Sequence, residues 1–398
     1  MSDLKITQRL TTTILALSLG SAGCQDPSGT ADTGLGAVVH DSAGIAIVQN
    51  SPPAPDSRLS WEIGAQPSLS IGAVESGGAD ELFQVRDATR LADGRIVIAN
   101  SGSSELRIFN ADGSHAGTWG RRGEGPGEFP IRGPTAISPW PGDSIAASDE
   151  FGARLSLFDL NGNHGRDVAF DIIRGGVLDV LPDGRIVSKG NRVFNREARD
   201  TADLIRLDTE WSVLDVDGTL HVSLGKFPAR EVFVSAVMGG EIPHPLMRRA
   251  VGAVWGNLVA VGVQNSYEIK AFAADGSLVR IVRRHWDPRT PTPAEYDEFH
   301  ARTRFARLPE QPPVDSYPAF EAIVADRAGY LWVREYRMFG EGPMVWTVFD
   351  SEGRIQGLVE TPVGLEVFEI GEDYVLGLVE DELGVEYVQL WALDREAG

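Results

Sequence analysis

The sequence is poor in cysteine and in positive charge. Its 398 residues contain one cysteine, Cys24, which excludes an intramolecular disulfide framework and a cysteine-rich zinc site. It has 36 Lys and Arg against 57 Asp and Glu, a formal net charge of -21. This charge argues against nucleic acid as a partner, because binding to phosphates requires a basic surface. With 42% hydrophobic and 23% charged residues, the composition excludes a disordered chain or a fibre and is typical of a folded domain.

Long apolar runs are also missing. The apolar stretch Leu10–Leu19 is well below the roughly 20 residues that a membrane-spanning helix needs. It follows two basic residues, so we predict a signal peptide over residues 1–23. The small residues directly before Cys24 resemble a bacterial lipoprotein signal, and this resemblance implies that Cys24 is acylated. Because Ser21 stands where that family usually has Leu, an ordinary signal peptide that leaves a free cysteine is the alternative.

Residues 24–42 are mostly Gly, Ser, Thr, Ala and Asp, with few large apolar side chains. Such a composition cannot form a packed core and predicts a flexible tether. Gln25 follows the cysteine, whereas Asp at this position is associated with retention in the inner membrane of enterobacteria. The resemblance therefore implies an exported, lipid-anchored protein, periplasmic or at the cell surface, and favours the outer membrane. Apart from this membrane contact through the N-terminal lipid, we expect a monomer.

A repeated pattern organises the rest of the chain. Each unit predicts two β-hairpins, with Asp-Gly or Asn-Gly at turns because these residues tolerate the positive φ that tight hairpins require. The turn of the first hairpin recurs at Gly94, Gly142, Gly184, Gly256, Gly329 and Gly371. Four short antiparallel strands form a propeller blade, so six such turns predict an all-β fold, a six-bladed β-propeller over residues 43–398.

The last repeat is incomplete, which predicts that the ring is closed from the N-terminus. After Gly371 the sequence shows two further strands before the chain ends, and an unclosed propeller would expose a strand edge. We predict that Ser68–Gly72 supplies the missing strand and that Gly44–Val48 extends the same seam.

Two intervals between turns are long enough to hold insertions. The first, about 227–246, is expected to form a loop that caps the channel. The second, about 286–318, contains Thr292 and Glu295 in a capping box, with Pro293 at the first helical position. It predicts a short helix, which would be a lid over the channel mouth or a passive clip on the outer face.

The segments Gly94–Asn100, Glu105–Gly113, Thr118–Gly120 and Gly125–Phe129 resemble the NHL repeat. The whole chain is similar to exported bacterial six-bladed β-propeller proteins of largely unassigned function. This resemblance covers residues 69–165 most closely and implies a binding or interaction module. A β-sandwich with similar hairpins is the alternative fold, but it leaves the six turns and the closing N-terminal strand unexplained.

Arginine residues at the starts of the inner strands are the candidate binding groups. Guanidinium groups suit bidentate contact with carboxylate or phosphate, so we expect an anionic small molecule or glycan at the channel mouth; a protein partner remains open. The predicted ligand-binding residues are Arg86, Arg132, Arg174, His244, Arg248, Arg249, Arg334 and Tyr336. In the alternative interpretation, the Arg residues at the inner strands bridge neighbouring blades through Glu81, Asp87, Glu128 and Glu321; these are Arg86, Arg132, Arg174, Arg248 and Arg249.

Enzymatic interpretations need metal ligands. The amidating-lyase relatives of NHL proteins hold zinc through several histidines, and of seven His here only His244 is expected near the mouth. The gluconolactonase and paraoxonase-like families hold calcium through Glu, Asn and Asp from separate blades, a role that Glu81, Asp149, Asn265 and Glu335 could fill. We therefore expect a binding module without a cofactor, and a calcium-dependent hydrolase or lactonase is the alternative; catalytic residues are not identified.

Overall fold

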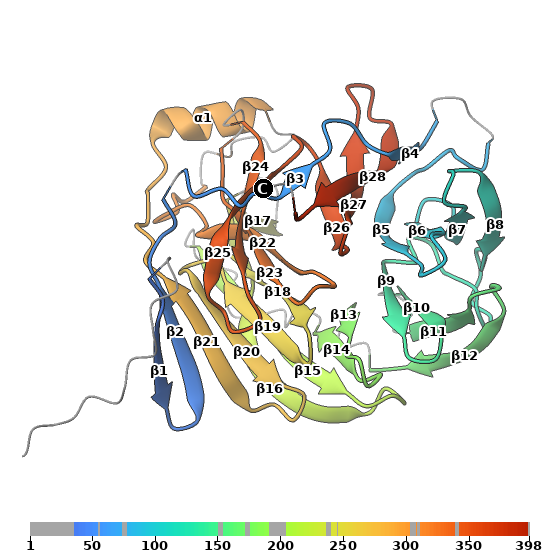
Figure 1. Cartoon of the computed structure of the whole chain (residues 1–398), viewed down its shortest axis with the longest axis horizontal. Helices are drawn as coiled ribbons and strands as arrows, with labels where there is room; N and C mark the ends of the chain where they lie inside the picture. Colours follow the sequence, from blue (N-terminus) through green and yellow to red (C-terminus); the bar gives the residue numbers. More distant parts are fainter. Residues whose placement is uncertain are drawn as a thin grey trace, which may run out of the picture. The chain divides into compact units, whose positions relative to one another are not determined.

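A computed structural model of the chain describes residues 36–396, apart from 55, 74–77, 150–153, 172–175, 191–203, 236–239, 245, 303–307, 309–310 and 339–341. The predicted signal peptide, Cys24 and most of the predicted tether lie outside these residues. The described residues belong to one unit, Asp32–Gly398. They form six β-sheets and one short helix, α1 (Pro293–Arg302) (Figure 1). In this part of the chain no helix combines the length and the apolar character needed to cross a membrane.

In each sheet, strands that follow one another in the chain pair as antiparallel hairpins. The sheets are numbered 1 to 6 by the order of these hairpins along the chain, and the first strand of a sheet means the first strand of its hairpins, not a strand added from the N-terminal segment. Sheet 1 contains β5 (Val85–Arg90), β6 (Ile96–Asn100), β7 (Glu105–Phe109) and β8 (His115–Trp119). Sheet 2 contains β9 (Ala136–Trp140), β10 (Ser144–Asp149), β11 (Arg154–Asp159) and β12 (His164–Ala169). Sheet 3 contains β13 (Gly176–Val180), β14 (Ile186–Lys189), β15 (Ile205–Leu214), β16 (Leu220–Ser235) and β17 (Gly240–Pro243).

The other three sheets continue the same hairpin pattern, and two of them also include strands from the N-terminal segment. Sheet 4 contains β18 (Ala250–Trp255), β19 (Leu258–Val263), β20 (Glu268–Ala273) and β21 (Leu278–Arg284), with β2 (Ile45–Asn50) and β1 (Val38–Ser42) beyond β21. Sheet 5 contains β22 (Phe320–Ala325), β23 (Leu331–Glu335), β24 (Met344–Phe349) and β25 (Ile355–Thr361). Sheet 6 contains β26 (Glu366–Ile370), β27 (Tyr374–Glu380) and β28 (Glu386–Asp394), with β3 (Glu62–Ile63) and β4 (Leu69–Ile71).

All six predicted first-hairpin turns lie between the first and second strands of a sheet, which confirms the repeat. At Gly94 and Gly184 φ is +91° and +87°, a conformation that residues with a Cβ seldom adopt. In both turns the preceding aspartate accepts the amide of the following arginine, as Asp93 does from Arg95. These contacts explain why the Asp-Gly-Arg sequence is found at both positions.

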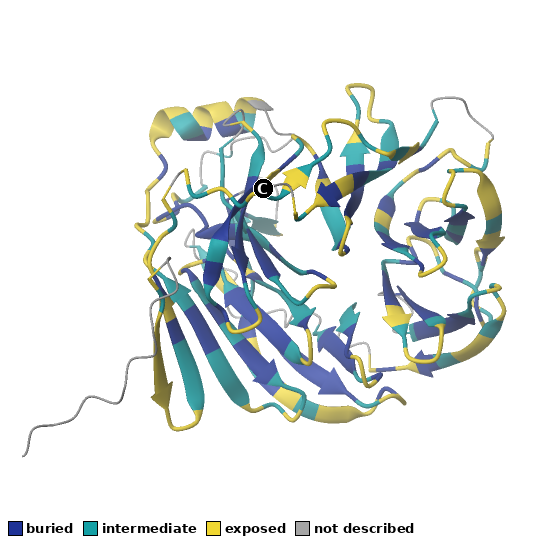
Figure 2. Ribbon diagram, viewed as in Figure 1, coloured by how far each residue is buried: buried dark blue, intermediate teal, exposed yellow. Residues whose placement is uncertain are grey.

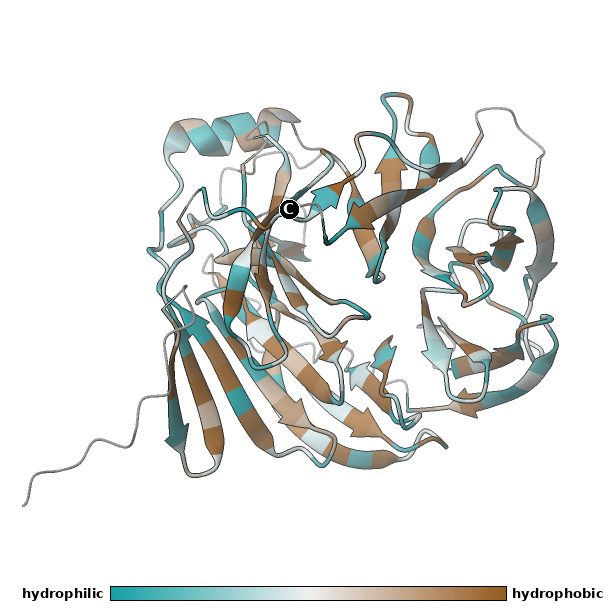
Figure 3. Ribbon diagram, in the orientation of Figure 1, coloured by the Kyte–Doolittle hydropathy of each residue, from teal (hydrophilic) through white to brown (hydrophobic). Residues whose placement is uncertain are grey.

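Six buried apolar clusters join the sheets in chain order, and each cluster is shared by two consecutive sheets. The sixth of these clusters joins sheet 6 to sheet 1 through Ile96, Ile98, Leu376 and Val388. The second strands of the sheets are therefore largely covered on both faces; β6, for example, is buried over its whole length. Figure 2 shows the buried residues of the strands, and Figure 3 shows the hydrophobic residues in the same orientation.

The predicted closing strand is present, but the strand before it has a different neighbour. β4 pairs antiparallel with β28, with Ile71 opposite Val388, as predicted for Ser68–Gly72. The prediction that Gly44–Val48 extends this seam is wrong, because β2 pairs parallel with β21 in sheet 4. Asn50 fixes this position: its buried side-chain amide donates to Gly353 O and accepts the Ile355 amide.

Two further boundaries differ from the sequence predictions. Val38–Ser42, assigned to the tether, is strand β1, because a tight turn at Gly44 pairs it with β2. The predicted capping loop at 227–246 is mostly strand: β16 continues to Ser235 and pairs with β15 and with β17. The insertion therefore lengthens a hairpin of sheet 3.

The helix of the second insertion forms as predicted. Thr292 Oγ1 accepts the Glu295 amide, and Glu295 in turn accepts the Thr292 amide, which completes the capping box. Tyr296 and Phe299 are buried together with Leu246 in a seventh apolar cluster. This cluster attaches α1 to the segment that follows β17.

Candidate functional site

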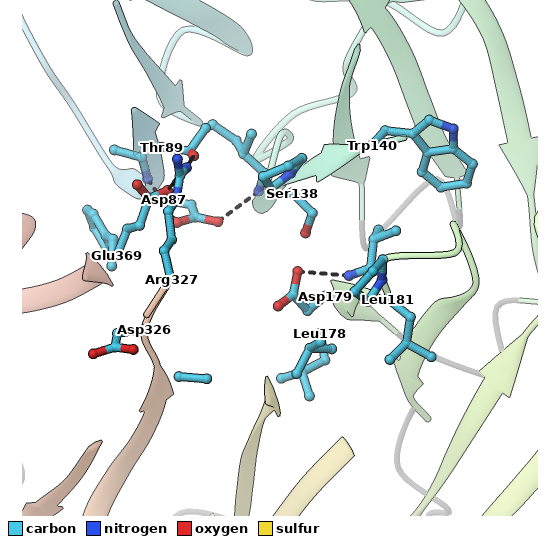
Figure 4. A pocket seen from close by; sticks show the side chains of 18 of the residues that line it. Asp87, Thr89, Ser138, Trp140, Leu178, Asp179, Leu181, Asp326, Arg327 and Glu369 are labelled. Atoms are coloured by element: carbon cyan, nitrogen blue, oxygen red, sulfur yellow. Dashed lines mark hydrogen bonds and ion pairs between the residues drawn. The ribbon is translucent and has the colours of Figure 1, made fainter. Parts of the chain in front are cut away.

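The first strands of all six sheets line one cavity of about 490 Å³, the central cavity. Four polar side chains from four strands face it at similar places, each one or two residues before the end of its strand. They are Thr89 on β5, Ser138 on β9, Asp179 on β13 and Glu369 on β26. Figure 4 shows them around the cavity together with Asp87 and Arg327.

The central cavity holds carboxylates in unequal environments. Glu369 pairs with Arg327 at 3.0 Å and accepts hydrogen bonds from Thr89 and Tyr374. Asp87 accepts backbone amides from Ala88 and, across the sheets, from Ile137. Asp179 accepts the Val180 amide and a hydrogen bond from the Ser138 hydroxyl.

No cationic side chain is among the groups that shift the pKa of Asp87 or of Asp179. Burial, together with the negative charges of Asp179 and Glu369, raises the pKa of Asp87 to about 8. Burial raises the pKa of Asp179 to about 6. Since desolvation disfavours the charged form of a carboxylate, we expect Asp87 to be largely protonated near pH 7.

The predicted residue Arg248 is not available to a ligand. Its guanidinium is buried and pairs with Glu231 at 3.0 Å, and it also donates to Ser316. Glu231 is fully buried, and it accepts the Arg248 amide and a hydrogen bond from Arg206. The alternative interpretation, a structural ion pair, therefore applies to Arg248, although its partner is Glu231 and none of the four expected carboxylates.

His244 is also enclosed, which corrects its predicted place at the mouth. It is fully buried, and its Nδ1 accepts the Leu246 amide while its Nε2 lies 2.9 Å from Pro312 O. Because Nδ1 accepts, Nε2 carries the proton and the ring is neutral; burial lowers the pKa of His244. The histidine therefore joins the two insertions to each other.

Arg249, next to Arg248, faces outward into a second cavity. This basic cavity has a volume of about 430 Å³ and lies between sheets 2, 3 and 4. Its wall contains Lys189, Arg230 and Arg249, and no Asp or Glu among the described residues. The Nε of Arg230 is buried without a hydrogen-bond partner in the described part of the chain, and no carboxylate there pairs with Arg249.

A third cavity, the apolar cavity, adjoins the basic cavity and has a volume of about 760 Å³. Arg249 and Met247 line both. The predicted residues Arg334 and Tyr336 also line the apolar cavity. Arg334 is paired with Glu321 at 2.8 Å, a salt bridge between neighbouring strands of sheet 5 and not one of the bridges between blades that the alternative interpretation expected.

The other predicted ligand-binding residues do not join this group. Arg86 and Arg132 are exposed and line neither the basic nor the apolar cavity. Arg174 lies outside the described residues, two positions before Gly176 of the basic cavity. Of the predicted set, the structure therefore brings together Arg249, Arg334 and Tyr336.

The predicted calcium ligands are not assembled. Within the described ranges, no three His, Cys, Asp or Glu side chains are placed to hold one metal ion. Glu335 is occupied by Arg284, Tyr267 and Thr347, whereas Glu81 and Asn265 are exposed and Asp149 is buried.

Sequence reasoning missed Arg230 and the roles of Asp179, Glu369 and Arg327. A signal for the two acids was present, because each stands shortly before a first-hairpin turn. No such signal marked Arg230, because it lies in the insertion whose extended pairing the sequence did not reveal.

Comparisons with known proteins add similar structures. The sequence matches no protein-family model and no curated protein. Among solved structures, a Bacteroides fragilis protein described as exported is 12% identical, with a TM-score of 0.47 over 87% of this chain and 99% of that chain. A member of the DUF4221 family from Bacteroides vulgatus is 10% identical, with a TM-score of 0.47 over 84% of this chain and 98% of that chain. A gluconolactonase from Xanthomonas campestris is 14% identical, with a TM-score of 0.39 over 78% of this chain and 87% of that chain.

Replacing Arg248 by Met should lower the free energy of unfolding by about 3–5 kcal/mol, because Glu231 would keep its charge in the interior with only Arg206 as a partner. Urea titration followed by tryptophan fluorescence measures this change. The exposed Arg132→Met is the matched control and should change stability by less than about 0.5 kcal/mol. Equal effects of the two substitutions would show that the Glu231 pair is not structural.

Stability should fall as the pH rises from 4 to 9. Asp87 and Asp179 have pKa values of about 8 and about 6 against an ordinary 3.8, so the folded protein holds protons that the unfolded chain releases. Their stabilising effect is complete below pH 3.8 and is lost as the pH passes 6 and then 8. Asp87→Asn should therefore flatten the decline of the urea midpoint between pH 6 and 9. The control Asp112→Asn, in an exposed turn, should keep the wild-type dependence of the urea midpoint on pH. The same dependence in Asp87→Asn would contradict the raised pKa of Asp87.

Proposed function

We propose that this chain is an exported, lipid-anchored six-bladed β-propeller that binds a small anionic ligand beside its two insertions. Support for the six-bladed ring comes from the central cavity, to which the first strand of each sheet contributes a wall. The apolar cluster between sheets 6 and 1 and the pairing of β4 with β28 support its closure. Each sheet is then one blade.

The basic cavity carries the proposal of an anionic ligand. In a chain with a net charge of -21, a wall with three basic and no acidic side chains among the described residues is a local reversal of the average charge. Arg230 and Arg249 keep donors that no described carboxylate uses. Guanidinium forks bind carboxylate or phosphate through paired hydrogen bonds, so a small anion satisfies both the charge and the free donors.

The same features favour binding over calcium-dependent hydrolysis. A calcium site needs several oxygen ligands around one point, and among the described residues no three His, Cys, Asp or Glu side chains are placed to hold one metal ion. The basic cavity is positive, which would repel a divalent cation. A binding module is therefore the function that the geometry supports best.

Removing the arginines of the basic cavity should abolish anion binding. We expect phosphate or benzoate at millimolar concentration to raise the melting temperature by a few degrees, because a ligand that binds only the folded state stabilises it. The variant Arg230→Met with Arg249→Met should lose this rise, and the exposed Arg132→Met should keep it. Benzyl alcohol serves as the neutral probe. No response to any anion in the wild-type protein would refute the proposal.

The proposed anchor is residue Cys24, after a signal peptide of residues 1–23 and before a tether that ends at β1. In cells that export the protein, Cys24→Ser should move it from the membrane fraction to the soluble fraction, because only the acylated cysteine holds it at the bilayer. Ser28→Ala, in the same segment, should stay with the membranes. Retention of the Cys24→Ser protein in the membrane fraction, or a mass spectrum of the wild-type N-terminus without lipid, would disprove the anchor.

A further inference from the structure

We infer that the ligand is an anionic amphiphile, with its charged group at Arg249 and its apolar body in the apolar cavity. This inference rests on the proposed function, because it assigns a ligand class to the same site. It starts from the shared wall: Arg249 and Met247 line both the basic and the apolar cavity. A ligand held by its anion at Arg249 therefore has direct access to the apolar cavity.

The apolar cavity is built for a flexible hydrocarbon surface. Its apolar wall includes Leu246, Met247, Phe299, Met338, Met344 and Val363. Three of the five methionines of the whole chain are in this wall, and methionine adapts its unbranched side chain to ligands of different shape. A volume of about 760 Å³ lies within the roughly 300–1,000 Å³ typical of small-molecule sites.

The polar groups of the apolar cavity are mostly satisfied within the protein. Arg334 pairs with Glu321 at 2.8 Å, so these two charges cancel. The side-chain amide of Gln264 accepts the Arg249 amide and donates to Glu321 O. The guanidinium of Arg249, which no described carboxylate pairs with, is therefore the cation at the junction that remains to bind an anion.

Val363 also lines the apolar cavity, and this residue is 68% exposed. It lies in the loop between β25 and β26. When an apolar chain fills the methionine-lined cavity, the exposed Val363 loses contact with water, and this loss favours binding. The chemistry thus points to a monomeric carboxylate or phosphate ester with an acyl or aryl body.

Isothermal titration of the full-length protein with decanoate, butanoate and decanol tests this class. Each methylene that leaves water strengthens binding by up to about fourfold, so decanoate should bind more than about tenfold tighter than butanoate. Decanol should bind more weakly than decanoate, because it lacks the charge. Equal affinities for butanoate and decanoate would overturn the inference of an amphiphile but would agree with the proposed anion site. If the protein bound neither acid nor phosphate, the proposed function itself would be refuted.

Two matched variants locate the apolar body. Val363→Glu should weaken decanoate binding more than about tenfold and leave phosphate binding unchanged. Leu383→Glu, an exposed apolar residue in a loop outside this cavity, should leave both unchanged. Equal losses of decanoate affinity in the two variants would overturn the assignment of the apolar body to this cavity. Binding to phosphatidylglycerol vesicles without binding to decanoate below its micelle concentration would overturn the assignment of a free amphiphile.

Discussion

The buried ion pair between Glu231 and Arg248 is the interaction on which the candidate site depends. Glu231 is fully enclosed, and a charge in that position is tolerated only when it is paired and hydrogen-bonded. The pair joins β16 of sheet 3 to the start of β18 in sheet 4, and through Ser316 it reaches the second insertion. Because Arg248 turns inward to meet Glu231, its neighbour Arg249 faces outward, and the basic and apolar cavities meet there.

The two insertions supply walls to these cavities, although the first does not form the loop expected of it. The first lengthens the hairpin of β15 and β16 and carries Ala229 and Arg230 to the basic cavity. The second places Phe299 of α1 in the wall of the apolar cavity. Buried His244 connects them, since its ring contacts Pro312 O from the segment after β17. A neutral, desolvated imidazole is well suited to such a position.

Charge is separated between two regions of the molecule. Around the central cavity, Asp87, Asp179 and Glu369 come from three different sheets, and burial keeps the pKa of the two aspartates high. Beside the insertions the charge is positive, with Lys189, Arg230 and Arg249 in one wall. A chain with an excess of acidic residues thus concentrates some of its few cations at one place, where an anion gains from both attraction and unused donors.

The sequence by itself determined the repeat. Asp-Gly turns and strand lengths are local properties, so they gave the six first hairpins, the strand at Ser68–Gly72 beside β28 and the capping box of α1. It also pointed to Arg249, Arg334 and Tyr336. Only the tertiary structure decided which arginine is buried, because Arg248 and Arg249 differ in their distance from Glu231 and not in their local sequence. The parallel pairing of β2 with β21 and the extension of β16 were likewise decided by contacts between residues far apart in the chain.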